Sequence, residues 1–246
     1  MSMKLSCRAL VVCAGLVAFT GCGFGGSNSK LSPGKIQAAR KVALVSVCLQ
    51  KEMGAVKGTK NFGAFDGNGA RMMLAPIVET LNAALGTEWK GVQFTPLAPS
   101  AEPSGRPVGE HRVCMNDVDG MTPGGFMGDP DLAYLGGLAT KLGVDAVLTM
   151  SGNPIIRHWD GKGAKAYVAS VGSGVQLHLV DRSGEEIAYV ELRDFETEYN
   201  LVPGTTDTAD ATKIGQSLGH LIGVGVAATV QGRKFEPPSR PGISGL

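Results

Sequence analysis

The sequence predicts an α/β (α+β) fold, in which a mixed sheet of about five strands carries helices packed on it. Three observations lead to this class. One Val-rich stretch is apolar on both faces, three stretches repeat apolar residues at helical spacing, and two late stretches alternate in polarity around a turn sequence. In chain order the expected elements are β-α-β-α-β-β-β-α, and the sequence contains no internal repeat.

The first expected strand is Lys41 to Leu49, whose continuous apolar run is typical of a buried central strand. Residues 50–69 are polar and Gly-rich, which indicates a loop. A helix follows from about Met72 to Gly86, because Pro76 fits best in a first turn and glycine is a natural helix stop. Val92 and Phe94 alternate with polar or small neighbours and indicate a second strand.

Residues 98–128 are rich in Gly and Pro and form an expected loop well beyond the ordinary connection length. The next helix is expected to have Asp129 as its N-cap, Pro130 as its first residue and Gly143 as its end. Its apolar stripe would consist of Leu132, Leu135, Leu138, Ala139 and Leu142.

The third strand is expected at Ala146 to Met150. Two longer strands follow at about 166–180 and 186–198, joined by the turn sequence Asp181-Arg182-Ser183-Gly184. His178 stands between two leucines in the first of them, so we expect it on the solvated face. A last helix is expected from about Asp210 to Val230.

The amino-terminal segment has the pattern of an export signal. Lys4 and Arg8 precede an apolar run of 11 residues, Ala9 to Phe19, which is too short to span a bilayer. The sequence Phe19-Thr20-Gly21-Cys22 resembles the lipobox of bacterial lipoproteins. The resemblance implies removal of residues 1–21 as a signal peptide and acylation of Cys22 by fatty acids such as palmitate, which would anchor the chain to a lipid bilayer.

Other features of this segment predict destination and domain layout. Gly23, and not Asp, follows the cysteine, which implies sorting to the outer membrane, on its periplasmic face. Composition predicts a lipidated flexible tether over residues 22–36, a single globular domain over 37–235 and a loose tail over 236–246.

The charge balance argues against nucleic acid as a partner. The signal carries two of the 23 basic residues and none of the 22 acidic ones, so the mature chain has 21 basic and 22 acidic residues, a net charge of −1. Phosphate binding requires clustered Lys and Arg. The same balance argues against a second, electrostatic contact with the membrane.

Two cysteines, Cys48 and Cys114, remain in the mature chain besides Cys22. In an oxidising compartment they either form a disulfide or stay as two separate thiols with Cys48 buried. The spacing does not show that the two cysteines meet in space, so separate thiols are the favoured interpretation. Neither lies in a C-x-x-C sequence, so no redox or metal site is predicted from them.

A glycine-rich stretch of the last expected helix offers two interpretations. Gly215-Gln216-Ser217-Leu218-Gly219 matches a nucleophile elbow as a string, but it lies in a helical pattern without the acid and His that must follow, so we interpret it as a chance match. Gly215, Gly219 and Gly223 form a small-residue face. It packs onto the domain's own sheet, or it contacts a partner helix or another copy.

The remaining polar residues give no catalytic, metal or cofactor signature. His111, His158, His178 and His220 lack the spacing of zinc ligands. Four acidic residues could form a looser ion site but are better explained as turn residues and a helix cap: Asp117, Asp119, Asp129 and Asp131.

A family resemblance rests on two short motifs. Gly143, Asp145 and Val147 form a G-x-D-x-V sequence where a helix leads into a strand, and Asp181 to Gly184 form the later hairpin turn. Over roughly residues 38–232 the chain resembles a group of bacterial envelope domains. This group includes the curli-secretion lipoprotein, the lipoprotein activator of penicillin-binding proteins and the N-terminal domain of the Tol-system β-propeller protein. The resemblance implies a non-catalytic binding module of the envelope.

We therefore expect a lipid-anchored envelope protein that binds another protein without catalysis. The alternatives are a self-assembling structural or secretion component, and an enzyme or ligand binder with an unrecognised site. The 98–128 loop discriminates among them. A pocket lined by His111, Arg112 and Asp117 would favour a ligand, whereas a flat apolar surface through Met121, Phe126 and Met127 would favour a protein partner.

Overall fold

The computed structural model describes nine segments of the chain, which are residues 29–50, 69–98, 112–116, 131–152, 155–161, 164–170, 175–192, 196–200 and 207–235. They contain the helices α1 (Pro33–Ala38), α2 (Gly69–Glu88), α3 (Leu132–Leu142) and α4 (Asp207–Val230). The strands are β1 (Ser29–Leu31), β2 (Lys41–Gln50), β3 (Gln93–Thr95), β4 (Arg112–Met115), β5 (Ala146–Gly152), β6 (Ile155–Gly161), β7 (Ala164–Ser170), β8 (Val175–Asp181), β9 (Glu186–Leu192) and β10 (Glu196–Asn200). The predicted signal peptide, Cys22 and the predicted tail lie outside the described residues.

A seven-stranded mixed sheet forms the centre of the domain. Its order is β1-β9-β8-β5-β2-β3, and β4 pairs with β2 next to β3. β2 runs parallel to β5 and β3 and antiparallel to β4. β6, β7 and β10 form a separate three-stranded antiparallel sheet. The predicted α+β class is confirmed, with a sheet larger than the expected five strands.

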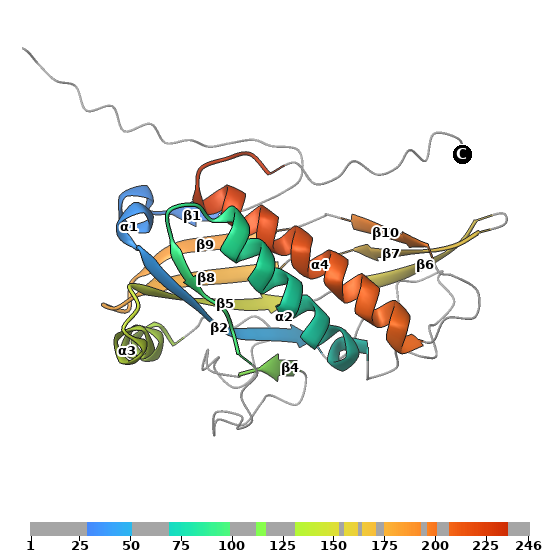
Figure 1. The fold of residues 1–246 in the computed structure, drawn as a ribbon, viewed down its shortest axis with the longest axis horizontal. Helices are drawn as coiled ribbons and strands as arrows, with labels where there is room; N and C mark the ends of the chain where they lie inside the picture. The colour runs from blue at the N-terminus through green and yellow to red at the C-terminus, as the bar shows by residue number, and fades with distance from the viewer. Residues whose placement is uncertain are drawn as a thin grey trace, which may run out of the picture.

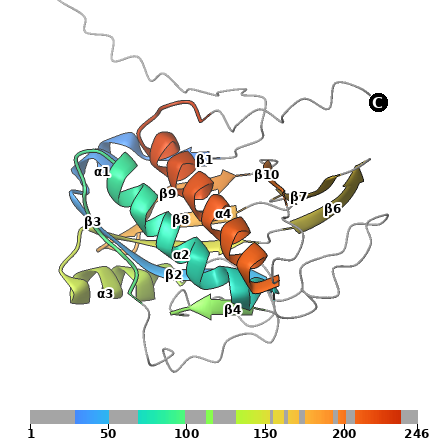
Figure 2. The ribbon, with the colours of Figure 1, turned by 45° about the vertical axis from the view of Figure 1, so that its right-hand side comes forward.

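Helices cover both faces of the main sheet. α2 and α4 lie side by side on one face, as Figures 1 and 2 both show, and α3 lies on the other face. Val42, Leu44, Val47 and Leu49 of β2 point into the larger apolar cluster beneath α2 and α4. A smaller cluster under α3 contains Ala43, Val45, Val147 and Val180. β2 is therefore the doubly covered central strand that its sequence predicts.

The glycine face of α4 packs against α2, and not against the sheet. A Cβ on Gly219 would lie 2.2 Å from the carbonyl oxygen of Ile77, and a Cβ on Gly215 would lie 2.9 Å from that of Met73. Gly223 is equally restricted, because its Cβ would lie 2.6 Å from the Cβ of Ala84. These three glycines are used inside the domain, where they let the two helix backbones approach closely.

Two helices begin elsewhere than predicted. α2 starts at Gly69 and carries Pro76 in its interior. Ala70 and Met73 are fully buried, and this packing sustains the helix across a residue that lacks an N–H donor. α3 is capped by Asp131, whose Oδ1 accepts a hydrogen bond of 3.0 Å from the amide of Tyr134, so the prediction of Asp129 as the cap is wrong.

The end of α3 agrees with the prediction in part. Gly143 adopts φ 69°, a left-handed conformation that glycine adopts without strain, and it ends the helix. Leu135 and Ala139 are fully buried, whereas Leu142 is 50% exposed, so its assignment to the apolar stripe is wrong. Leu142 is the last helical residue.

The local sequence pattern did not separate several of the strands. The expected strand over 166–180 includes parts of β7 and β8, and the expected strand over 186–198 includes β9 and part of β10. β7 and β10 pair with each other in the small sheet, while β8 and β9 pair in the large one. The alternation of polarity that predicts a strand does not reveal which sheet the strand joins.

Two segments expected to lack regular structure have it. Residues 29–36, assigned by composition to the tether, form β1 and the start of α1, because β1 pairs with β9 and Ile36 is buried. Within the expected 98–128 loop, Arg112–Met115 form β4 on β2. Over the nine described segments, no helix is both long and apolar enough to cross a membrane.

Candidate functional site

Two rows of polar residues cross one face of the main sheet. Ser46, Thr149, His178 and Tyr189 are successive partners across β2, β5, β8 and β9. The second row runs in the same way through Cys114, Cys48, Ser151, Gln176 and Glu191. A register shift in β2 between Leu44 and Ser46 places these rows on the face that carries Ala43, beyond the apolar cluster of α3. The shift explains why the alternation of β2 did not predict them.

His178, in the first row, is buried. Its Nδ1 lies 2.7 Å from Oε1 of Glu186, and its ring lies beside that of Tyr189 with the centroids 5.1 Å apart. The expectation that His178 faces solvent is therefore wrong: His178 lies on the face of β8 opposite to Leu177 and Leu179, as alternation requires, but that face is buried at this position. Within the described segments, Nε2 of His178 has no hydrogen-bond partner.

The polar rows do not assemble a nucleophile and base. Ser151 Oγ is buried and also lacks a hydrogen-bond partner within the described part, so it makes no hydrogen bond to His178. No group of three or more His, Cys, Asp or Glu side chains in the described ranges could hold a metal ion. What the rows show is a buried polar layer held in part by the His178–Glu186 contact.

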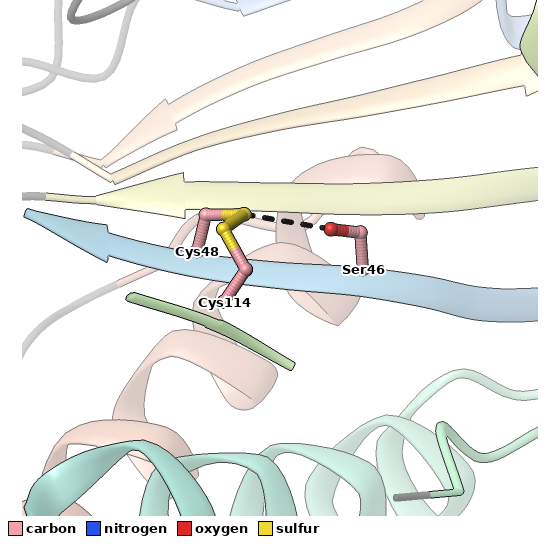
Figure 3. The surroundings of a disulfide bond; sticks show 3 residues. All are labelled: Ser46, Cys48 and Cys114. Atoms are coloured by element: carbon pink, nitrogen blue, oxygen red, sulfur yellow. Dashed lines mark hydrogen bonds between the residues drawn. A yellow bond between two sulfur atoms is a disulfide. The ribbon is translucent and has the colours of Figure 1, made fainter. Parts of the chain in front are cut away.

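Cys48 and Cys114 form a disulfide. They are direct partners across β2 and β4, with their Cα atoms 4.1 Å apart, and Cys48 is almost completely buried. Figure 3 shows the two sulfur atoms beside Ser46, whose Oγ lies 3.6 Å from Cys48 Sγ. Of the two alternatives left open by the sequence, the structure contains the disulfide and not the separate thiols, because β4 forms inside the expected loop.

A cleft of about 510 Å³ lies at one end of the domain, where α1, the end of α2 and the end of α4 meet. Its apolar lining includes Ile36, Trp89, Val92 and Val230. Gln231 helps to shape it, since its Nε2 donates to the carbonyl oxygen of Glu88 at 2.9 Å and so joins the two helix ends. The volume falls within the range of ordinary ligand sites.

Two cations, Arg40 and Lys90, line this cleft, and no Asp or Glu of the described segments lines it. The Arg40 guanidinium lies against Gly91, where a Cβ would be 3.6 Å from Nη1. Gly91 has φ 78°, so the turn after α2 is a glycine conformation. Over the described residues, the Arg40 side chain has no recorded hydrogen bond or ion pair, and Lys90 Nζ donates to the Thr87 carbonyl at 2.5 Å.

The structure separates the residues that the sequence singled out. Asp131 is a helix cap, His220 is exposed on α4, and Ser217 lies inside that helix, so the elbow-like string has no elbow. Arg112 lies in β4, opposite Gln50. His158 lies in β6. The other candidate residues lie outside the described residues, namely Cys22, His111, Asp117, Asp119, Met121, Phe126, Met127 and Asp129.

Comparison with protein-family models finds no matching family. Comparison with curated proteins finds no relative. Among solved structures, the chain is similar to the PelC dodecamer from Paraburkholderia phytofirmans, with 15% identity and a TM-score of 0.31 over 80% of this chain and 96% of that chain. It is also similar to a minor lipoprotein from Acinetobacter baumannii, with 12% identity and a TM-score of 0.32 over 78% and 95% of the two chains. At these values the likeness carries no argument about function, and the predicted family resemblance stays a prediction.

Proposed function

We propose that this chain is a lipid-anchored protein of a bacterial cell envelope whose domain binds another envelope protein without catalysing a reaction. The observation that carries the proposal is the buried Cys48–Cys114 disulfide, taken together with the lipobox cysteine Cys22. Disulfides persist in oxidising compartments outside the cytoplasm. The bond and the amino-terminal signal pattern therefore support the same destination by independent routes.

The proposal places the domain close to its membrane. Ser29, the first residue of β1, comes seven positions after Cys22, and a chain extends at most about 3.3–3.6 Å per residue, so the link reaches roughly 25 Å. Gly23 after the cysteine supports sorting to the periplasmic face of the outer membrane. A link this short limits partners to proteins that lie at or near the same membrane.

The side chains of the cleft support binding without catalysis. The two cations that line the cleft, Arg40 and Lys90, supply hydrogen-bond donors and positive charge. His178 and Ser151 are buried and not bonded to each other. The internal packing of Gly219 on α2 weighs against self-assembly through the glycine face of α4, because that face is already covered.

Two experiments test the proposal. Growth with labelled palmitate should label the full chain but not the Cys22→Ala variant, and an unlabelled wild-type chain would disprove the anchor. Crosslinking in living cells, followed by mass spectrometry, should recover one envelope protein in stoichiometric amount, and its recovery should fall in Cys22→Ala. Recovery of copies of this chain alone would instead support self-assembly.

A further inference from the structure

Basic residues outnumber acidic ones in the sequence around the cleft, and we call this end of the domain the cationic end. Seven cations lie within two positions of a cleft-lining residue, namely Lys30, Lys35, Arg40, Lys41, Lys90, Arg233 and Lys234. Within the same windows Glu88 is the acidic residue, and an ion pair with Glu185 takes up Lys35. The carboxylate of Asp145 also lies at this end, bonded to the amides of Arg40 and Lys41. The near-neutral total charge of the chain does not exclude this local excess of cations, because a total carries no information about position.

The cationic end is also the end next to the proposed anchor. Leu31, which lines the cleft, comes nine positions after Cys22, so an extended link reaches at most about 30 Å from the acylated residue. We propose, on the basis of the lipid anchor proposed above, that this cleft binds the phosphate-bearing headgroup of an anionic phospholipid in the membrane that holds the chain.

The lining suits such a headgroup. The Arg40 guanidinium, which has no recorded partner over the described residues, presents a planar set of donors that matches phosphate oxygens. Lys90 adds a second charge. The apolar lining formed by Ile36, Trp89 and Val92 offers contact to the glycerol backbone and the first methylenes of the lipid. A headgroup bound here orients the domain with its cleft end toward the bilayer.

The test uses the mature chain from residue 22 with Cys22→Ser, so that no acyl chain contributes. Cosedimentation with vesicles of phosphatidylethanolamine containing phosphatidylglycerol should show binding that weakens as salt rises, and vesicles of phosphatidylethanolamine alone should bind much less. Arg40→Gln should weaken binding about fivefold, the factor expected for one cation near an anionic surface. Lys90→Gln should have a similar effect.

Arg71→Gln is the matched control. Arg71 is exposed and lies near the start of α2, at the opposite end of that helix from Lys90, so its loss should leave binding unchanged. Equal binding to both vesicle types, no binding to either, or an equal loss in Arg71→Gln would overturn the proposal. So would Arg40-dependent binding of soluble glycerol phosphate or of an acidic peptide without binding to vesicles. Each of these failures would leave the palmitate-labelling result untouched, so the anchor is judged separately.

Discussion

The carboxylate of Asp145 accepts a hydrogen bond from the main-chain amide of Lys41 at 2.9 Å, and so ties the start of β5 to the start of β2. The amide of Arg40 donates to the same oxygen at 2.9 Å, and Arg182 Nη2 lies 3.2 Å from the other oxygen. The Lys41 amide holds the pKa of Asp145 below its usual value; burial opposes this, and the Arg40 amide and the Arg182 charge reinforce it. The aspartate of the G-x-D-x-V motif thus links two strands, and we call its contacts with Arg40, Lys41 and Arg182 the Asp145 clamp.

Asp145→Asn should reduce the dependence of stability on acidic pH. A carboxyl whose folded pKa lies below its unfolded value, about 3.9, contributes stability that is present above that value and is lost as pH falls through the folded pKa. The amide variant cannot carry the charge, so its free energy of unfolding at neutral pH should be roughly 1–2 kcal/mol lower than that of the wild type. On acidification, its free energy of unfolding should fall less than that of the wild type. Urea unfolding at a series of pH values measures both, and equal pH slopes would contradict the clamp.

Gly219→Ala should destabilise the domain by about 1–3 kcal/mol or more, because its Cβ would overlap the Ile77 carbonyl and Thr80 Oγ1. Gly137→Ala, on α3, is the matched control, since nothing lies within 4 Å of its added Cβ. It should stabilise the domain by about 0.5–1 kcal/mol through helix propensity. Unfolding midpoints of the two variants should move in opposite directions, and a Gly219→Ala variant as stable as the wild type would show that α2 and α4 are not in close contact.

Replacing both Cys48 and Cys114 by Ala should lower the free energy of unfolding by roughly 2–4 kcal/mol. The bond joins residues separated by 66 positions, and an unfolded chain without it gains the entropy of that loop. Urea unfolding with and without reductant provides the control, because reductant should weaken the wild type and leave the double variant unchanged. A wild type insensitive to reductant under unfolding conditions would argue against the bond.

Asn82→Asp should destabilise the segment after β3. Asn82 Nδ2 donates to the Leu97 carbonyl at 3.0 Å while Oδ1 accepts from the Leu97 amide at 2.9 Å, so an ionised Asp places two oxygens face to face. We expect a loss of about 1–3 kcal/mol at neutral pH, which shrinks in acid as the carboxyl regains a donor. Gln93→Glu, an exposed amide-to-acid change in β3, should have little effect. A loss independent of pH would point to a different cause.

Local pattern predicted the elements whose burial is regular along the chain. β2, β5, the turn at Asp181–Gly184 and the length of α4 all follow from apolar periodicity and glycine placement. Asp181 Oδ1 accepts from the amides of Ser183 and Glu185, and Gly184 adopts φ 79°, so the turn chemistry is entirely local. Features of this kind can be predicted from the sequence, because the residues that determine them lie within a few positions of one another.

Features made by distant segments were not predictable in this way. The cleft combines residues near 31–40, 89–92 and 230–232, and nothing in the local sequence marks Arg40 and Lys90 as the cations that line it. The burial of His178 was not predictable from β8 alone, because alternation along a strand gives the face of a side chain and not whether that face is covered. The role of Asn82 was not predictable either. Its partner Leu97 lies after β3, and the sequence does not show that this segment contacts α2.

The pairing of β1 with β9 constrains how the chain completes its fold. Lys30 lies opposite Tyr189, so a chain that emerges amino-terminus first must hold its earliest strand unpaired until most of the domain has followed. The rest of the sheet can form while that strand waits. Closure of this sheet edge is therefore a long-range event, and β1 waits longer for its sheet partner than any other strand of the main sheet.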